Sequence, residues 1–174
     1  MPELQSPLSH RGDDVPSGVP SVVLDTNVVL DCLLFQDVSC AKLSDMLLTG
    51  QLLWHATSAM RSELASVLPR QQFQRWSPDC EHILSVFDGL TKACHQPPCA
   101  ADATARLRCR DPDDQKFIDL ALAVNARWLF SKDRALLALA RPARAYGVQV
   151  LTPAQWQRQC MATSAAAACA APPG

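Results

Sequence analysis

The sequence predicts an α/β fold with a mainly parallel central sheet. Short β-branched runs such as Val22-Val23-Leu24 are typical of buried parallel strands. Segments with helical periodicity separate these runs along the chain. Because parallel strands need long connections that are usually helical, this alternation favours an α/β sheet with right-handed crossovers.

The first part of the chain is predicted to contain two strands and four helices. The strand over 22–24 stops at Asp25, and a helix follows from Val28 to Phe35 with Asp31 on its exposed side. A glycine at position 50 is a helix-stop signal for the next helix. The further elements are a helix over 40–48, a strand over 52–54, a helix over 58–68 beginning at Thr57 or Ser58, and a helix from Pro78-Asp79 to Leu90.

The second part of the chain begins with a stretch that is hard to interpret, 93–109, although a strand over 107–109 is plausible. Asp111-Pro112-Asp113 then combines a capping carboxylate, a first-turn proline and an acid that the helix dipole favours. This helix should run to about Asn125. The remaining elements are a strand over 127–130, a helix from 133 to about 140, a strand over 147–151 and a helix capped by Thr152-Pro153.

The length of 174 residues corresponds to one domain. Residues 1–20, with four prolines among polar residues, are predicted to be a disordered lead. The ordered domain should span 21–159, and 160–174 should form an Ala-rich flexible tail.

Composition excludes several classes of protein. The net charge of −1 argues against a strong non-specific hold on nucleic acid. There is no apolar run long enough to cross a membrane and no secretory-signal pattern, so a cytoplasmic protein is expected. The eight cysteines form no CxxC pair, which favours free thiols in a reducing compartment. Only Cys94-His95 with Cys99 offers a cysteine-based metal site, and it is a weak candidate.

Two acids stand where parallel sheets build their sites, at the carboxyl ends of strands. Asp25 ends the first strand, and Asp133 follows the strand over 127–130. An acid beside a buried strand is costly unless a hydrogen bond or a cation compensates it. Each of the two could therefore be a helix cap or part of a cation site.

Further acids lie in Ser58–Leu68 and in the DPDD run. Glu63 lies one turn into its helix beside an apolar stripe, where it is either a solvated flanking residue or a site residue. The DPDD run carries three acids, Asp111, Asp113 and Asp114, which is more than one helix cap needs.

Together these segments resemble the PIN domain family. VVLDTNVVLDCLL, SEL within a helix and DPDDQKFIDLALAVNARWLFSKDRALL carry the resemblance, which spans about 21–152. It is closest to the bacterial branch of toxin–antitoxin toxins, the VapC-like ribonucleases. The resemblance implies a three-layer α/β/α sandwich with a mainly parallel sheet, and a nuclease that uses Mg²⁺ or Mn²⁺.

The resemblance also implies a set of site residues. Asp25, Glu63, Asp114 and Asp133 would be the catalytic, metal-binding acids. Asp114 is preferred because it stands seven residues before Ala121, in the family's usual frame, which leaves Asp111 as the cap. A supporting shell would consist of Thr26, Asn27 and Ser131.

Substrate and partners are implied in the same way. The substrate would be RNA, whose phosphates could meet basic residues that flank the acids, although these could equally be solvated surface charges. Lys132 stands where the family often has glycine. A partner antitoxin would dock in an apolar groove among the early helices, and a homodimer is expected. The basic residues are Arg61, Lys116, Lys132 and Arg134.

Two other functions are compatible with parts of the pattern. One is a catalytically silent PIN-like domain that binds RNA or protein, although all four acidic positions are filled. The other is a haloacid-dehalogenase-like phosphatase, which needs a second Asp where this chain has Asn27. The chain has no Gly-rich phosphate loop, so no nucleotide cofactor is expected.

Overall fold

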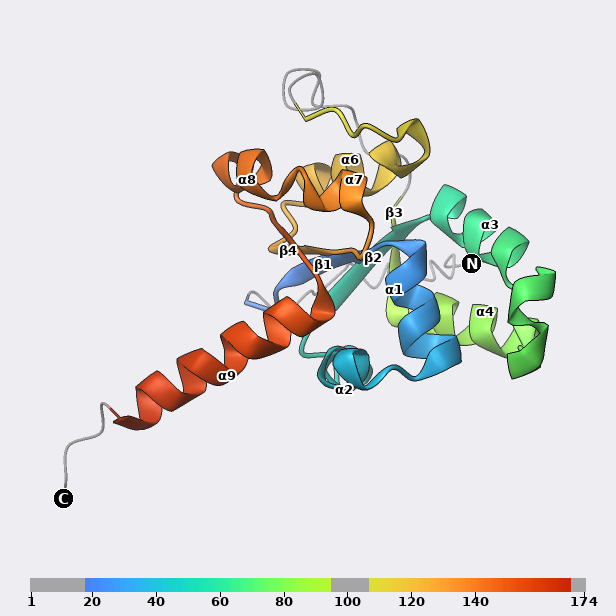
Figure 1. The fold of residues 1–174 in the computed structure, drawn as a ribbon, viewed down its shortest axis with the longest axis horizontal. Coiled ribbons are helices and arrows are strands. Elements are labelled where there is room, and N and C mark those ends of the chain that lie inside the picture. The colour runs from blue at the N-terminus through green and yellow to red at the C-terminus, as the bar shows by residue number, and fades with distance from the viewer. Residues whose placement is uncertain (1–17, 95–106, 170–174) are drawn as a thin grey trace, which may run out of the picture.

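The computed structural model describes residues 18–94 and 107–169 (Figure 1). Within them a single sheet has the strand order β3-β2-β1-β4-β5, and every neighbouring pair is parallel. The predicted α/β fold with a parallel sheet is therefore confirmed. The strands are β1 (Ser21–Leu24), β2 (Leu53–Thr57), β3 (Thr91–Cys94), β4 (Trp128–Phe130) and β5 (Gln149–Leu151).

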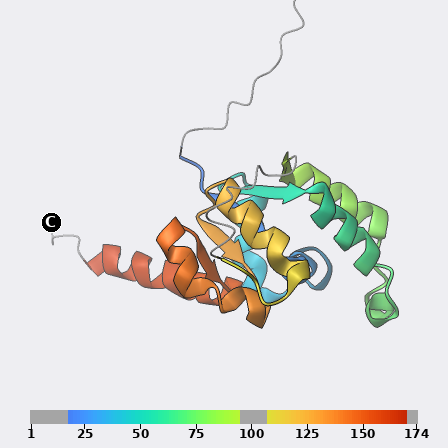
Figure 2. The ribbon, with the colours of Figure 1, turned by 90° about the horizontal axis from the view of Figure 1, so that it is seen from above.

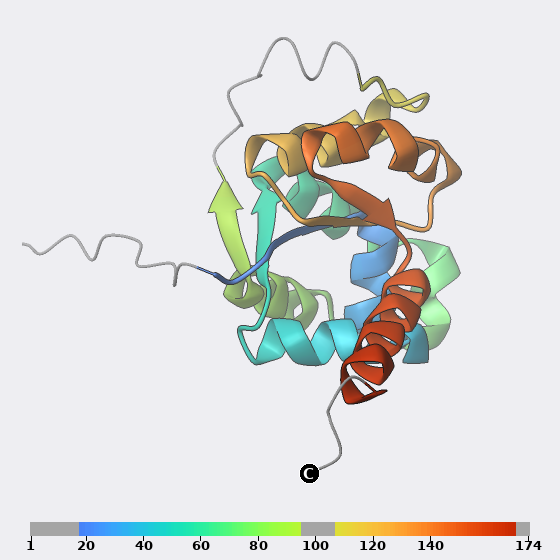
Figure 3. The same ribbon diagram turned by 90° about the vertical axis from the view of Figure 1, so that its left-hand side faces the viewer.

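Helices cover both faces of the sheet and make three layers, as expected (Figure 3). One layer contains α1 (Thr26–Leu30), α2 (Ala41–Leu48) and α4 (Cys80–Leu90). The other contains α6 (Gln115–Ala123), α7 (Arg134–Leu137) and α8 (Ala140–Ala143). A further helix, α3 (Ser58–Val67), continues from the carboxyl end of β2 and packs beside α4 (Figure 2).

The strand order decides where a site can form. From β1 the chain proceeds outward through β2 to β3, and then returns to place β4 on the other side of β1. The order therefore reverses between β1 and β4, whose last residues Leu24 and Phe130 are paired. In open α/β sheets, ligands bind outside the carboxyl ends of strands at such a reversal.

The core consists of the apolar strands and the helix stripes that pack on them. Val22 and Val23 of β1 are completely buried, and so is Leu120 of α6. On the opposite face, Trp54 of β2 meets Phe87 of α4 edge to face at 5.0 Å. Each such large apolar side chain stabilises the fold by roughly 1.5–3 kcal/mol, which holds β1 rigidly at the centre of the sheet.

The helix predicted from Val28 to Phe35 starts earlier and changes character halfway. Asp25 is its N-cap, and after α1 the chain continues as a π-helical turn, Asp31–Phe35, which ends at Gln36 with a left-handed φ of 51°. The expected exposure of Asp31 is wrong. Asp31 is buried because its carboxylate pairs with Lys132 from the far side of the β1–β4 junction.

The strand suggested at 107–109 is not found. The backbone N–H of Cys109 and the backbone C=O of Leu107 instead bond to the side chain of Gln115, at 2.7 and 3.0 Å. The third strand on that side of the sheet is β3, which was not expected. Its sequence, Thr-Lys-Ala-Cys, lacks the apolar run of a central strand because β3 lies at the sheet edge.

The last elements also differ in extent. The helix expected from 133 to 140 is divided into α7 and α8, and α9 (Pro153–Cys169) continues beyond Gln159 and extends away from the sheet (Figure 1). Residues 1–17 and 170–174, from the expected lead and tail, lie outside the described residues, as do His95 and Cys99. Short 3₁₀ turns occur at Val38–Cys40, Gln71–Trp76, Pro112–Asp114 and Arg144–Tyr146.

Two composition-based expectations can be compared with the described residues. The six cysteines that the structure describes are all free thiols, as expected. No helix in the described ranges is both long and apolar enough to cross a membrane.

Candidate active site

Asp25 lies at the carboxyl end of β1 and is almost completely buried, with 2% of its surface exposed. Its Oδ1 accepts the N–H of Val28 at 2.9 Å, which caps α1. Its Oδ2 accepts a hydrogen bond from the hydroxyl of Ser131. Burial raises the pKa of Asp25 above its ordinary value, while the hydrogen bonds from Ser131 and from nearby backbone N–H groups oppose that rise.

Ser131 connects the two strand ends. It follows β4 directly, is completely buried, and accepts the N–H of Asp133 at 2.9 Å while it donates to Asp25. Asp133 in turn caps α7, with its Oδ1 accepting the N–H of Ala135 at 2.6 Å. One hydroxyl therefore fixes the positions of both acids that the sequence placed at strand ends.

Asp114 reaches the same region from the start of α6. It is half-buried, while Asp111 provides the N-cap of this segment by accepting the N–H of Asp113 at 2.9 Å. The structure therefore confirms the expected role of Asp111 as the helix cap, and this leaves Asp114 free of that role. Burial, followed by the charges of Asp133, Asp111 and Asp25, raises the pKa of Asp114 to about 6. Asp114 is therefore close enough to Asp25 and Asp133 to feel their charges.

Glu63, on α3, differs from the other three acids because a lysine neutralises it. The Lys116 ammonium lies 2.7 Å from Glu63 Oε2 and also donates to the backbone C=O of Asp113. The structure thus joins α3 to the start of α6 through Glu63 and Lys116. Thr57 caps α3, which confirms the expected helix start.

The supporting residues expected beside Asp25 occupy different environments. Thr26 is buried and Asn27 is exposed in the first turn of α1. The backbone N–H of Asn27 is among the donors that lower the pKa of Asp25. Only Ser131, of these residues, is found with its side chain bonded to one of the acids in the described structure.

Three of the four basic residues expected to meet phosphates are paired with carboxylates. Lys116 pairs with Glu63, as described above. Arg61 forms a two-pronged pair with Asp88 of α4, at 2.6 and 2.8 Å. Lys132 bridges Asp31 at 2.6 Å and Asp37 at 3.2 Å.

The fourth, Arg134, is exposed and lines an open depression of about 580 Å³ beside Asp133. Arg110 lines the same depression and was not singled out from the sequence. Its position directly before the DPDD run could have indicated it. It also directly follows the segment 93–109, whose path the sequence does not predict. Cations beside an acidic site can hold the phosphates of a substrate.

The carboxylate oxygens of these acidic residues are the kind of ligand that a hard divalent cation prefers. Among the described residues, no ion pair joins Asp25, Asp114 or Asp133 to a basic side chain. Carboxylates that repel one another and lack a cation favour binding of Mg²⁺ or Mn²⁺, which prefer oxygen ligands. In the part of the chain that is described, no three Asp, Glu, His or Cys side chains are arranged so that together they could hold a metal ion.

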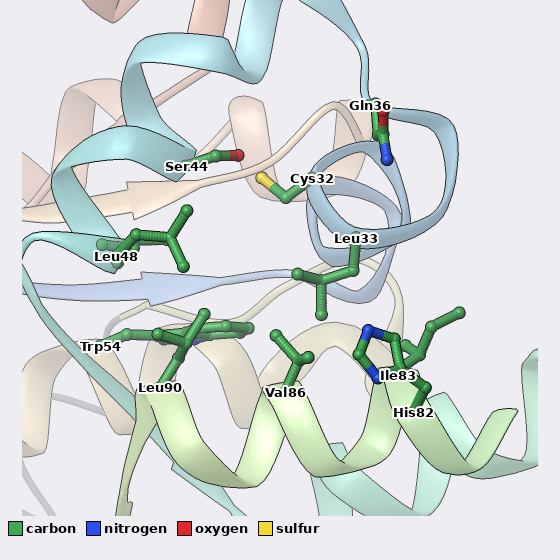
Figure 4. A pocket seen from close by; sticks show the side chains of 11 residues that line it. Cys32, Leu33, Gln36, Ser44, Leu48, Trp54, His82, Ile83, Val86 and Leu90 are labelled. Atoms are coloured by element: carbon green, nitrogen blue, oxygen red, sulfur yellow. The ribbon is translucent and has the colours of Figure 1, made fainter. Parts of the chain in front are cut away.

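A separate apolar cavity of about 200 Å³ lies between the π-helical turn, α2 and α4 (Figure 4). Leu33 and Cys32 line it from the turn, Leu48 from α2, and Ile83 and Val86 from α4. It opens among the early helices and not at the carboxyl ends of β1 and β4, so it is distinct from the acidic site.

The fold and the site define a class, that of α/β domains with carboxylates gathered at a sheet reversal. A family profile described as PIN domain matches residues 21–135. The chain belongs to the PIN domain family, and the predicted resemblance is confirmed.

The solved structures agree with this assignment. The chain is similar to a chain in the crystal structure of VapBC2 from Rickettsia felis bound to a DNA fragment from their promoter. The similarity has a TM-score of 0.53 and covers 76% of this chain and 98% of that chain. At 13% sequence identity it is a similarity of fold. No curated protein matches the chain at a significant level.

Proposed function

We propose that this protein is a metal-dependent endoribonuclease, and that it is the toxin of a type II toxin–antitoxin pair. One observation carries the nuclease proposal. Asp25 and Asp133 are joined through Ser131 where β1 and β4 end, the charges of both act on Asp114, and within the described chain none of the three forms an ion pair with a basic side chain. Such a set of acids is costly to the fold unless a cation neutralises it.

Asp25 and Asp114 would be the principal ligands of Mg²⁺ or Mn²⁺, with Asp133 and Glu63 binding directly or through water. When bound, the ion would lower the pKa of a water molecule and stabilise negative charge on the phosphate oxygens. Ser131 holds Asp25 and the backbone of Asp133 in fixed positions, which is the usual task of a residue behind a metal ligand.

The substrate would lie over the exposed side of these acids. Arg134 and Arg110 line a depression that also includes Asp133, and they would bind phosphates of the RNA there. Thr26 and Asn27 follow Asp25 and would orient it or its waters. Lys116 forms an ion pair with Glu63. If a metal ion bound Glu63 instead, the Lys116 ammonium would be available to a phosphate.

The partner proposal rests on the family and the fold. The sequence resembles VapC-like toxins, and the fold is like that of a chain of VapBC2. The antitoxin would place an apolar segment in the cavity lined by Leu33, Leu48 and Ile83, away from the acidic site. The nuclease domain would span 21–159, act in the cytoplasm and form a homodimer.

The test compares the wild type with Asp25→Asn on total RNA and on single-stranded DNA, each with Mn²⁺, Mg²⁺ or chelator. The change keeps the shape of the side chain but removes its charge. We expect metal-dependent cleavage of RNA by the wild type and its loss in Asp25→Asn. Asp45→Asn, an exposed change on α2, is the matched control and should cleave like the wild type.

Calorimetric titration with Mn²⁺ completes the test. Tight binding that Asp25→Asn weakens would support the metal site even if the RNA offered were not the preferred target. Equal cleavage by wild type and Asp25→Asn would disprove the site. No cleavage and no Mn²⁺ binding would indicate a catalytically silent domain that binds RNA or protein.

A further inference from the structure

A second depression, of about 410 Å³, lies where β4 and β5 begin. Trp128 and Gln149, the first residues of these paired strands, line it. Lys42 contributes from α2, and Trp156 and Cys160 contribute from α9. Since the acidic site lies where β1 and β4 end, this depression is at the opposite end of the sheet.

The charge in this depression is entirely positive. Lys42 and Arg127 line it, and no aspartate or glutamate does. Within the described residues, neither cation forms an ion pair with a carboxylate. This contrasts with Lys116, Lys132 and Arg61, which are all paired. Two unneutralised cations at one concave surface attract an anion.

Each of the two cations makes a cation–π contact with a tryptophan ring. The Lys42 ammonium lies 5.8 Å from the ring centre of Trp156, and the Arg127 guanidinium lies 4.6 Å from that of Trp128. The two indoles meet edge to face at 5.6 Å. Trp156 is 2% exposed, and its Nε1 has no hydrogen-bond acceptor in the described structure. A buried donor without a partner is uncommon and often marks a site where a ligand group or water binds.

We propose that this depression binds a nucleotide, with Lys42 and Arg127 holding the phosphate and Trp128 contacting the base. Arg binds phosphate with two parallel hydrogen bonds, and Lys adds a point charge. A flat indole surface suits any base because every base has an aromatic face. The nucleotide could be free or the end of an RNA strand.

The shape of the depression favours a nucleotide over an acidic peptide. Its volume is in the range of small-molecule sites. The Gln149 amide offers both a donor and an acceptor, as the edge of a base requires, whereas a carboxylate needs donors only. Aromatic surface next to the cations has no role in binding carboxylates alone.

The test uses the full chain in chelator, so that the acidic site is empty of metal and RNA is not cut. Adenosine and uridine monophosphate, a 5′-phosphorylated RNA tetramer, and the same tetramer without the phosphate are titrated by calorimetry. The variant is Lys42→Gln/Arg127→Gln. The control is Arg70→Gln/Arg141→Gln, which removes the same charge at exposed positions elsewhere.

We expect a phosphorylated ligand to bind, at least tenfold weaker binding in Lys42→Gln/Arg127→Gln, and unchanged binding in the control. Binding of the monophosphates would identify a free nucleotide, and binding of the phosphorylated tetramer alone would identify an RNA end. Equal weakening in both variants, binding independent of the phosphate, or tighter binding of a poly-glutamate peptide would overturn the proposal.

A second measurement needs no variant. Cys160 is half-buried at the edge of the depression, so a bound nucleotide should slow its alkylation several-fold. Peptide mapping would compare it with Cys80, which is also half-buried but lies on α4. Unchanged alkylation of Cys160 at saturating nucleotide would overturn the location. Because neither readout depends on cleavage, this proposal can fail while the nuclease proposal holds.

Discussion

The hydroxyl of Ser131 donates a hydrogen bond to the carboxylate of Asp25, although the two residues are 106 positions apart in the sequence. The same oxygen accepts the backbone N–H of Asp133 at 2.9 Å. The ends of β1 and β4 are thus joined by one side chain with no access to solvent. The position of Asp25 depends on this hydroxyl as well as on the cap of α1.

Ser131→Ala should leave a buried carboxylate oxygen and a backbone N–H without their partner. We expect a loss of roughly 1–3 kcal/mol in the free energy of unfolding, measured by urea denaturation in chelator. Mn²⁺ affinity should fall by about 10- to 100-fold, as is typical when a residue behind a metal ligand is removed. Ser85→Ala, at an exposed position of α4, should change neither quantity. If Ser131→Ala were as stable as the wild type, the role of the Ser131–Asp25 hydrogen bond would be contradicted.

The raised pKa of Asp114, about 6, predicts how stability depends on pH. The folded chain holds this proton to higher pH than the unfolded chain, whose aspartates titrate near 3.8. Ionisation between about pH 4 and 6 therefore favours unfolding, so stability is lost as pH rises through that window. In chelator, the melting temperature of Asp114→Asn should rise relative to that of the wild type as pH goes from 4 to about 6, and the difference should level off above that window.

At pH 7.5, added Mn²⁺ should make the wild type melt higher than Asp114→Asn. The ion stabilises the folded wild type by binding to it, whereas Asp114→Asn lacks one of its ligands. Asp45→Asn is the matched loss of an exposed charge. A difference between Asp114→Asn and wild type that is constant with pH would show that Asp114 is not destabilised by its neighbours.

Lys132→Met should destabilise the fold through Asp31. The Asp31 side chain is only 12% exposed, and the substitution would leave its charge without a cation. Since the lysine itself is 38% exposed, we expect a loss of roughly 1–2 kcal/mol by urea denaturation. The double variant Lys132→Met/Asp31→Asn should recover part of the lost stability, because it has no unpaired charge at position 31. Asp37→Asn should cost less because Asp37 is more exposed, and an equal cost would contradict the leading role of Asp31.

Gln115→Ala should release the segment over 107–109 without unfolding the domain. Its side chain holds the Cys109 N–H and the Leu107 C=O. A net hydrogen bond is worth about 1 kcal/mol, so amide hydrogen exchange at Cys109 should accelerate roughly five- to tenfold. Gln74→Ala, at an exposed position, is the control. Unchanged exchange at Cys109 would mean that other contacts hold this segment.

The sequence predicted the strand ends and the acids on them because the signals are local. Asp25 and Asp133 each follow an apolar run and precede a helix, and a side chain there can cap the helix within three residues. Capping does not exclude a place in the acidic site, because one oxygen of Asp25 caps the helix and the other accepts the hydroxyl of Ser131.

The errors came from contacts between residues distant in the sequence. The partner of Asp31 lies beyond β4, so periodicity could only place this acid on the polar side of its helix. Leu107 and Cys109 alternate like a strand, but the side chain of Gln115 takes the place of a neighbouring strand. The edge position of β3 removed the apolar signal that identifies central strands.

The position of β1 between β2 and β4 has a consequence for synthesis of the protein on the ribosome. A nascent chain that has emerged only as far as β3 can pair β1, β2 and β3 and still lacks Ser131 and Asp133. Asp25 then has neither its serine nor its acidic neighbours. The acidic site is therefore completed only after most of the chain has been translated. For the proposed ribonuclease, this order would keep an unfinished polypeptide from cutting the message from which it is being made.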